Sequence, residues 1–342
     1  MKNSICIVPK LSGLGGMVSF QEKFIQGMRE RDLAYTFDIK QAATSAILII
    51  GGTRQLWQLW RAKRRGIPII QRLNGMNWMH RVEKTPTKAV IRSELNNWLL
   101  AFIRRFIATG IIYQSDFSQE WWQRIYGESE KQHCVIHNGI DLTTYSIEGL
   151  ESPPEDHDRI LLVEGHLSGA NARGLETAVN LAQAVKNLHR RTVELMVVGD
   201  VADPIKARMH TIAPDLWITW RGVLPLAEIP AVDRSAHVLF SADLNAACPN
   251  SVIEALACGL PVLAYDTGAL KELVHDGAGK VVPYGANHWR LEAPSIPPLA
   301  AACVDILENN AAFRQRARQR AVSAFGLDKM VAAYLGVLEK HV

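Results

Sequence analysis

The sequence predicts an α/β protein built from two doubly wound, Rossmann-like domains. Short apolar runs alternate with amphipathic segments along both halves of the 342-residue chain, and strands separated by helices pair in parallel because a parallel pair needs a covering crossover. SIEGLESPPEDHDR (146–159) breaks this alternation, and its proline and acidic content is typical of a linker. We therefore expect one domain over 1–150 and another over 151–325, which face each other and bind ligands at their strands' carboxyl ends, in the cleft between them.

Each predicted element follows from a local pattern. Apolar runs of strand length end at glycine, proline or polar turns, and longer segments have helical periodicity. In the first half, the predicted strands are SICIVP (4–9), AILIIGG (46–52), IPIIQRL (67–73), GIIYQS (110–115) and HCVIHNG (133–139), and the predicted helices span about 17–31, 56–66 and 88–107. In the second half, the predicted strands are 159–165, 193–200, 217–222, 237–242, 260–265 and 280–285, and the predicted helices are 175–188, 299–325 and 327–342.

The composition is that of a soluble globular protein. Hydrophobic residues make up 48% of the chain, and a net charge of +4 is too small to indicate nucleic-acid binding. The N-terminus lacks the apolar core of a signal peptide, and no apolar run reaches the roughly 18 residues that a membrane span needs. The five cysteines are scattered without zinc spacing, which favours buried thiols in a reducing compartment. We expect a cytoplasmic protein.

The helix predicted over 88–107 carries arginines beside large apolar residues. Arg92, Arg104 and Arg105 accompany Trp98 and Phe102. Such a helix either lies on an anionic membrane surface, which would make the protein membrane-peripheral, or packs its apolar side on its own sheet and turns its arginines to water, which is the commoner arrangement.

A glycine-rich loop follows the first predicted strand. In LSGLGGM (11–17), Gly15 and Gly16 open a helix, where glycine lets the backbone approach a ligand and the helix N-terminus offers N–H groups to an anion. The spacing is not G-x-G-x-x-G, and no acidic residue ends the second strand. Ligand contact and a plain tight turn both fit.

The second half opens with a similar loop, VEGHLSGANARGLE (163–176). Gly165 ends a strand, and His166 and Arg173 flank the small residues. An arginine at this place either grips a diphosphate in a bidentate manner or is a solvated side chain near a helix start.

Glu254 lies at the start of a short predicted helix in CPNSVIEALACG (248–259). Ser251 and Glu254 have the spacing of a capping box, with Ser251 at the N-cap and Glu254 at the third helical position, and this alone accounts for the carboxylate. The alternative is that Glu254 holds a ligand.

Five segments in the second part of the chain form an ordered set. They are VIHNGIDLTTY (135–145), EGHL with RG (164–174), VELMVVGD (193–200), WRGVLPLAEIPAVDRSAHVLFSA (220–242) and CPNSVIEALACGLPVLAYDTGALKELV (248–274). Taken in this order, they resemble the retaining glycosyltransferases of family 4, the group 1 enzymes with the GT-B fold. The resemblance implies that two Rossmann-like domains face a cleft and that a C-terminal helix, 326–342, packs back on the N-terminal domain.

The resemblance also assigns roles to residues. It implies that Glu254 binds the ribose of a sugar nucleotide, and that Arg173 and His166 stabilise the leaving diphosphate. Other donor-side candidates are Gly15, Gly16, Gly165, Asn250, Ser251, Gly268, Ala269, Leu270 and Glu272, and acceptor-side candidates are Arg72, Asn74 and Asn77. No metal or other cofactor is implied, since no acidic cluster with ligand spacing appears.

Two departures from the family pattern bear on activity. The family places an acidic residue eight positions before the glutamate, where this chain has Ala246 beside Asn245 and Asp243. His166 replaces an arginine, and a histidine is a weaker, pH-sensitive partner for an anion.

The sequence therefore predicts a glycosyltransferase that moves a sugar, with retention, from a nucleoside diphosphate sugar to an acceptor hydroxyl in polysaccharide or glycolipid assembly. The alternatives are a sugar-nucleotide epimerase or hydrolase of related fold, and a sugar-nucleotide-binding protein without catalysis.

Overall fold

The computed structural model describes residues 4–340 except 14, 42–43, 168–171 and 190. The chain divides into two compact units. Unit 1 comprises residues 1–139 together with 326–342, and unit 2 comprises residues 140–325. The boundary between them precedes the proline-rich part of the linker, so the predicted limit at residue 150 falls inside unit 2.

Unit 1 contains a six-stranded parallel sheet in the order β2-β1-β3-β4-β5-β6. Its strands are β1 (Ser4–Val8), β2 (Tyr35–Thr36), β3 (Thr44–Ile50), β4 (Ile69–Leu73), β5 (Gly110–Tyr113) and β6 (Gln132–Val135). Its helices are α1 (Gly16–Arg29), α2 (Leu56–Arg64), η1 (Met79–Arg81), α3 (Thr87–Phe102), the π-helical turn η2 (Ile103–Ile107), α4 (Asp116–Tyr126) and α12 (Leu327–Lys340).

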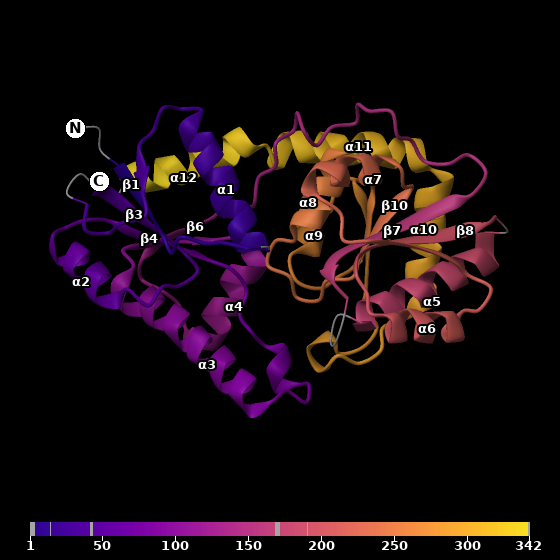
Figure 1. The fold of residues 1–342 in the computed structure, drawn as a ribbon, viewed down its shortest axis with the longest axis horizontal. Helices are drawn as coiled ribbons and strands as arrows, with labels where there is room; N and C mark the ends of the chain where they lie inside the picture. Colours follow the sequence, from indigo (N-terminus) through magenta and orange to yellow (C-terminus); the bar gives the residue numbers. More distant parts are fainter. Residues whose placement is uncertain (1–3, 14, 42–43, 168–171, 190, 341–342) are drawn as a thin grey trace. The chain divides into compact units, whose positions relative to one another are not determined.

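Helices cover both faces of this sheet. On one face, Phe24 of α1 and Tyr334 of α12 pack over apolar strand residues such as Leu48 (Figure 1). On the other face, Leu59 of α2 and Ile103 of η2 complete a second core. The C-terminal helix thus belongs to unit 1, and Gly27 of α1 lets it approach closely.

Unit 2 contains a second six-stranded parallel sheet in the order β12-β11-β10-β7-β8-β9. Its strands are β7 (Asp158–His166), β8 (Val193–Asp200), β9 (Trp217–Gly222), β10 (Val238–Ser241), β11 (Val262–Tyr265) and β12 (Gly279–Val282). Its helices are α5 (Ala172–His189), α6 (Asp203–Ile212), η4 (Leu226–Glu228), α7 (Ile229–Arg234), α8 (Asn250–Ala257), α9 (Leu270–Leu273), η5 (His288–Arg290), α10 (Ile296–Glu308) and α11 (Asn310–Ala324). The two parallel sheets confirm the predicted α/β class.

Several predicted elements differ from the structure at their ends, and two of these differences have a clear form. The predicted helix over 299–325 is two helices, α10 and α11, because the side chain of Asn309 donates hydrogen bonds to the carbonyl and carboxylate of Asp305 and closes α10. The predicted strand over 133–139 ends at Val135. In the part of the chain that the structure describes, no helix is both long and apolar enough to cross a bilayer.

Candidate functional site

The strand order of unit 2 selects one place along the sheet edge. β7 has β8, the next strand in sequence, on one side and β10 on the other, so the order reverses between β7 and β10. Ligands of doubly wound sheets bind outside the carboxyl ends of the strands at such a switch point. The loops that follow β7, β10 and β11 therefore form the candidate site.

Two of the predicted cationic residues lie at or just after the end of β7. His166 is its last residue, and its Nδ1 lies 2.9 Å from Oδ2 of Asp200, at the end of β8. Arg173 lies in the first turn of α5 and donates a hydrogen bond of 3.1 Å to the carbonyl of Leu291. Both side chains lie at the carboxyl edge, but Asp200 already pairs with His166. Residues 168–171 of the connecting loop lie outside the described part of the chain.

Two carboxyl groups that the sequence prediction did not group together influence each other electrostatically at the switch point. Glu164 lies near the end of β7, and Asp243 follows β10, the neighbouring strand. Burial raises the pKa of the Glu164 carboxyl well above its usual range, and the charge of Asp243 raises it further. Burial also raises the pKa of Asp243. The sequence does contain one signal for this pair, because Glu164 is an acidic residue that directly follows the apolar run ILLV.

The loop after β10 holds a buried amide without a protein partner. Asn245 has a left-handed backbone, with φ of 57°, and its side chain is only 3% exposed. Among the described residues, neither its Nδ2 nor its Oδ1 finds a hydrogen-bond partner, and neither does the hydroxyl of Ser241 at the end of β10. Because an unsatisfied buried polar group costs about 1–3 kcal/mol, these atoms are suited to a ligand or water.

The loop after β11 is fastened to the loop after β10. The amide of Ala269 donates 2.9 Å to the carbonyl of Ala246, and the amide of Leu270 donates 3.3 Å to that of Thr267. Gly268 has φ of 60°, and a Cβ there would lie 2.6 Å from the backbone of Ala246, so only glycine fits. Among the donor-side candidates Gly268, Ala269 and Leu270, the backbone amides of the last two are thus engaged within the protein.

The capping-box interpretation of Ser251 and Glu254 is wrong. Helix α8 begins at Asn250, directly after Pro249 at the N-cap position, and no side chain caps it. Pro249 fixes an extended entry into the helix two residues earlier than the capping box requires, so Asn250 and Ser251 lie in the first turn and Glu254 lies in the second.

Glu254 is buried among other titratable groups. Burial raises the pKa of Asp233 in α7, and the charge of Glu254 raises it further. The same two causes, in the same order, raise the pKa of Tyr145. Glu272 lies in the short helix α9, and Arg320 of α11 donates a hydrogen bond to its carbonyl.

The candidates in unit 1 lie in two places. The loop after β1 leads into α1, whose N-cap is Gly15 with φ of 126° and whose first residue is Gly16. A Cβ on Gly15 would meet nothing within 4 Å, so the backbone is accessible there. Gln21 of α1 holds this loop, since its side chain accepts from the amide of Leu11 and donates to the carbonyl of Pro9.

Arg72 is a buried structural residue in this structure, not an accessible acceptor group. It lies in β4, fully buried, with its guanidinium 3.8 Å from the centre of the Phe20 ring. It donates 2.8 Å to Oδ1 of Asn138 and 3.3 Å to Oδ1 of Asn74. Asn77 is exposed, and its amide is held by Oδ1 of the buried Asn97. The buried partners Asn97 and Asn138 had no distinguishing signal in the sequence.

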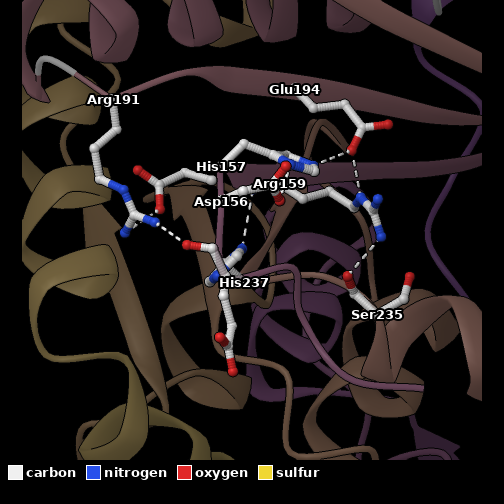
Figure 2. Close-up of polar contacts among 9 residues, drawn as sticks. Asp156, His157, Arg159, Arg191, Glu194, Ser235 and His237 are labelled. Atoms are coloured by element: carbon white, nitrogen blue, oxygen red, sulfur yellow. Dashed lines mark hydrogen bonds and ion pairs between the residues drawn. The ribbon is translucent and has the colours of Figure 1, made fainter. Parts of the chain in front are cut away.

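A polar cluster lies at the opposite, amino-terminal edge of the unit 2 sheet (Figure 2). His157 and Arg159 both contact Oε2 of Glu194, and Arg159 also donates 2.9 Å to the carbonyl of Ser235. Arg191 pairs with Asp158 at 3.1 Å. These groups pair with one another at the strand starts, away from the carboxyl edge, so we assign the cluster to stability.

Two Rossmann-like units with these strand orders define the class of protein. Over 99% of its length the chain matches a glycosyltransferase from Rickettsia africae ESF-5, with a TM-score of 0.68 at 14% identity and 98% of that chain covered. It also matches HepE of Anabaena in complex with UDP and glucose, with a TM-score of 0.67 at 15% identity, covering 98% of this chain and 99% of that one. The chain has the GT-B fold.

The sequence comparisons identify the domain that carries the site. Residues 158–309 match the family model "Glycosyl transferases group 1", so this part of the chain is a group 1 glycosyltransferase domain. A curated relative, the 2-deoxystreptamine glucosyltransferase of Streptomyces kanamyceticus, is 36% identical over 120 residues. That match spans 33% of this chain and only 29% of the relative.

Proposed function

We propose that the protein is a glycosyltransferase that moves a hexosyl group from a nucleoside diphosphate sugar to an acceptor hydroxyl, with retention and without a metal. The observation that carries this proposal is the coincidence of the group 1 domain with the β7–β10 switch point, where Arg173 and the loops after β10 and β11 converge. Solved structures of HepE, which has the same fold, hold UDP or UDP-glucose. The acceptor, in this proposal, is a glycan or a lipid-linked glycan in the cytoplasm.

The chemistry requires stabilisation of the diphosphate that leaves. Negative charge grows on it as the glycosidic bond breaks, and preplaced donors lower that barrier. Arg173 supplies a fixed charge and His166 supplies a second hydrogen-bond donor, both at the carboxyl edge of the unit 2 sheet. Glu254, now without a capping role, accepts hydrogen bonds from ribose hydroxyls.

The decisive experiment measures UDP released from UDP-glucose and related donors, with and without glycan acceptors. We expect release that depends on the acceptor, and a sugar-transfer product of unchanged anomeric configuration. Release without any acceptor favours the hydrolase or epimerase. Tight donor binding without turnover favours the non-catalytic binding protein, the candidate to which Ala246 points.

Glu254→Gln tests the ribose role. We expect donor affinity to fall at least tenfold while the melting temperature stays equal or rises, because the change removes a charge beside the buried Asp233. Isothermal titration with UDP and thermal unfolding measure the two quantities. Glu148→Gln, at an exposed position in the same unit, is the matched control. Unchanged UDP affinity in Glu254→Gln would contradict the assignment.

A further inference from the structure

Helices α2 and α3 of unit 1, with the π turn η2, expose a set of large apolar side chains. We call this set the aromatic–basic surface; its exposed apolar members are Trp57, Trp60, Ile91, Leu95, Trp98 and Phe106, and they are joined by Phe102, which is half-buried and also packs against the core. Trp57 is 64% exposed, Leu95 61%, Phe106 58% and Trp98 57%. Single exposed apolar residues are common, but a contiguous group of this size marks an interaction site.

The α3 part of this surface is a stripe along one side of the helix. Residues 91, 95, 98, 102 and 106 follow one another at spacings of three or four, which places them in a row. The rings of Trp98 and Phe102 lie 5.4 Å apart, and those of Phe102 and Phe106 lie 5.1 Å apart. Ile103 and Ile107 belong instead to the buried core against the sheet. The segment formed by α3 and η2 therefore has a second apolar side, in addition to the side that packs against the sheet.

Helix α2 lies beside this segment and extends the surface (Figure 1). Nζ of Lys63 donates 2.6 Å to the carbonyl of Phe106, which joins the two elements. Trp57 and Trp60 stack with their ring centres 4.9 Å apart, and the guanidinium of Arg64 lies 4.7 Å from the Trp60 ring.

The same surface is strongly cationic. The sequence has no acidic residue between Asp38 and Glu83, and that interval includes α2. The exposed cations around the aromatic rings are Arg61, Lys63, Arg64, Arg65, Lys88, Arg92 and Arg105. These cations also affect a neighbouring lysine. Burial lowers the pKa of Lys131 to about 8, and the positive charges of Lys63, Arg104 and Arg105 lower it further.

We propose that the aromatic–basic surface binds the face of an anionic lipid bilayer, with its rings among the headgroups and its cations on the lipid phosphates. Indole rings suit this interface because one end is apolar and the other is polar. Ile91 and Leu95 insert among acyl chains, whereas a nucleic acid would offer them no partner. The charge pattern matches anionic lipids, which attract juxtamembrane cations. The helices lie on the membrane and do not cross it.

The test is flotation of the full-length protein with vesicles of phosphatidylcholine alone or with one-third phosphatidylglycerol. It needs no sugar donor, so its outcome is separate from that of the proposed transferase function. We expect at least tenfold tighter partitioning to the anionic vesicles, weakened by 0.5 M salt. Arg61→Gln/Arg65→Gln should weaken binding by about fivefold per cation removed, since each contributes about 1 kcal/mol near such a surface. Trp57→Ala/Trp98→Ala should weaken it at least tenfold.

The matched controls lie in unit 2. Val223→Ala/Leu226→Ala removes comparably exposed apolar side chains, and Arg221→Gln/Arg316→Gln removes exposed cations. Both should bind vesicles as the wild type does, and circular dichroism verifies that every variant is folded. Equal binding to both vesicle types would overturn the proposal, as would unchanged binding of both surface variants. Self-association that only the tryptophan variant abolishes, or duplex DNA binding in the absence of vesicle binding, would also overturn it.

Discussion

Buried polar residues at the switch point of unit 2 are not explained by the packing of the domain. Asn245 has a left-handed backbone and a buried amide that finds no hydrogen-bond partner among the described residues, and Glu164 and Asp243 are two half-buried carboxyls that influence each other's charge. Each arrangement lowers stability relative to an apolar residue of the same size. Groups of this kind persist where a site requires them, which agrees with a ligand at the carboxyl edge.

Replacing Asp243 with asparagine should stabilise the protein, and more so at high pH. A carboxyl whose pKa is raised in the folded state binds more protons there than in the unfolded chain, so it lowers stability as the pH rises above about 4. We expect Asp243→Asn to raise the free energy of unfolding at pH 8, because the ionised carboxyl is disfavoured in the folded state relative to the unfolded chain. The gain should shrink toward pH 5.

Urea unfolding at pH 5 and pH 8 measures this difference. Asp200→Asn is the control, since Asp200 is exposed and pairs with the exposed His166. Its stability should follow that of the wild type at both pH values within about 0.5 kcal/mol. A gain in Asp243→Asn that is the same at both pH values would refute the coupled-carboxyl interpretation.

At the scale of elements, the sequence predicted which strands are present better than it predicted the residues at which they begin and end. Apolar runs located the buried strands because their signal is the burial itself. The two-residue strand β2 has no such run, and the start of α8 depends on Pro249, whose effect competes with the capping pattern of Ser251 and Glu254. The site was predicted from charges near loops, so Arg173 and His166 were found at the carboxyl edge. The burial of Arg72 against Phe20 was not predicted, because a sequence does not reveal that a cation packs on a buried ring.

The contact between α1 and α12 gives a prediction for one element pair. A Cβ on Gly27 would lie 2.5 Å from Cγ2 of Val331, a buried β-branched residue that has little freedom to move. We expect Gly27→Ala to destabilise unit 1 by about 1–3 kcal/mol, despite the better helix propensity of alanine. Thermal unfolding followed by circular dichroism measures the effect.

Two further variants isolate the cause. Gly336→Ala places a methyl where nothing lies within 4 Å in α12, so it should stabilise by about 0.5–1 kcal/mol from propensity alone. Val331→Ala removes the obstructing methyls, and Gly27→Ala should cost less in that background than in the wild type. Equal costs in both backgrounds would show that Gly27 and Val331 do not clash.

At the scale of the whole molecule, alternation predicted two Rossmann-like units but not the order of their strands. Unit 1 reverses between β1 and β3, and unit 2 between β7 and β10. The same alternation of strands and helices is compatible with several strand orders. These orders differ in which strand each strand–helix–strand connection leads to. The switch points, and with them the grouping of Glu164 with Asp243, therefore become visible only in three dimensions.

Global stability should fall as the pH drops from 7 to 5, and His237 is a principal cause. Burial lowers the pKa of His237 to about 4, helped by the charges of Arg191 and Arg314, while the unfolded chain titrates near 6.5. The unfolded state thus binds more protons throughout this window, so stability is present above about pH 6.5 and is lost toward pH 4. Because the ring is partly exposed, we expect a loss on the order of 1 kcal/mol between pH 7 and pH 5.

His237→Asn separates this effect from other titrations. Nδ1 of His237 accepts a hydrogen bond of 3.0 Å from the amide of Arg159, and the Oδ1 of an asparagine is placed to accept the same bond without titrating. Urea unfolding at pH 7 and pH 5 should show a smaller loss in His237→Asn than in the wild type, while His210→Asn, at an exposed position on α6, keeps the full loss. Hydrogen bonds from Thr219, Arg159 and His157 outweigh burial and hold the pKa of Glu194 below its usual range, so its contribution is lost only at lower pH. A wild-type loss that persists undiminished in His237→Asn would assign the acid sensitivity to other groups.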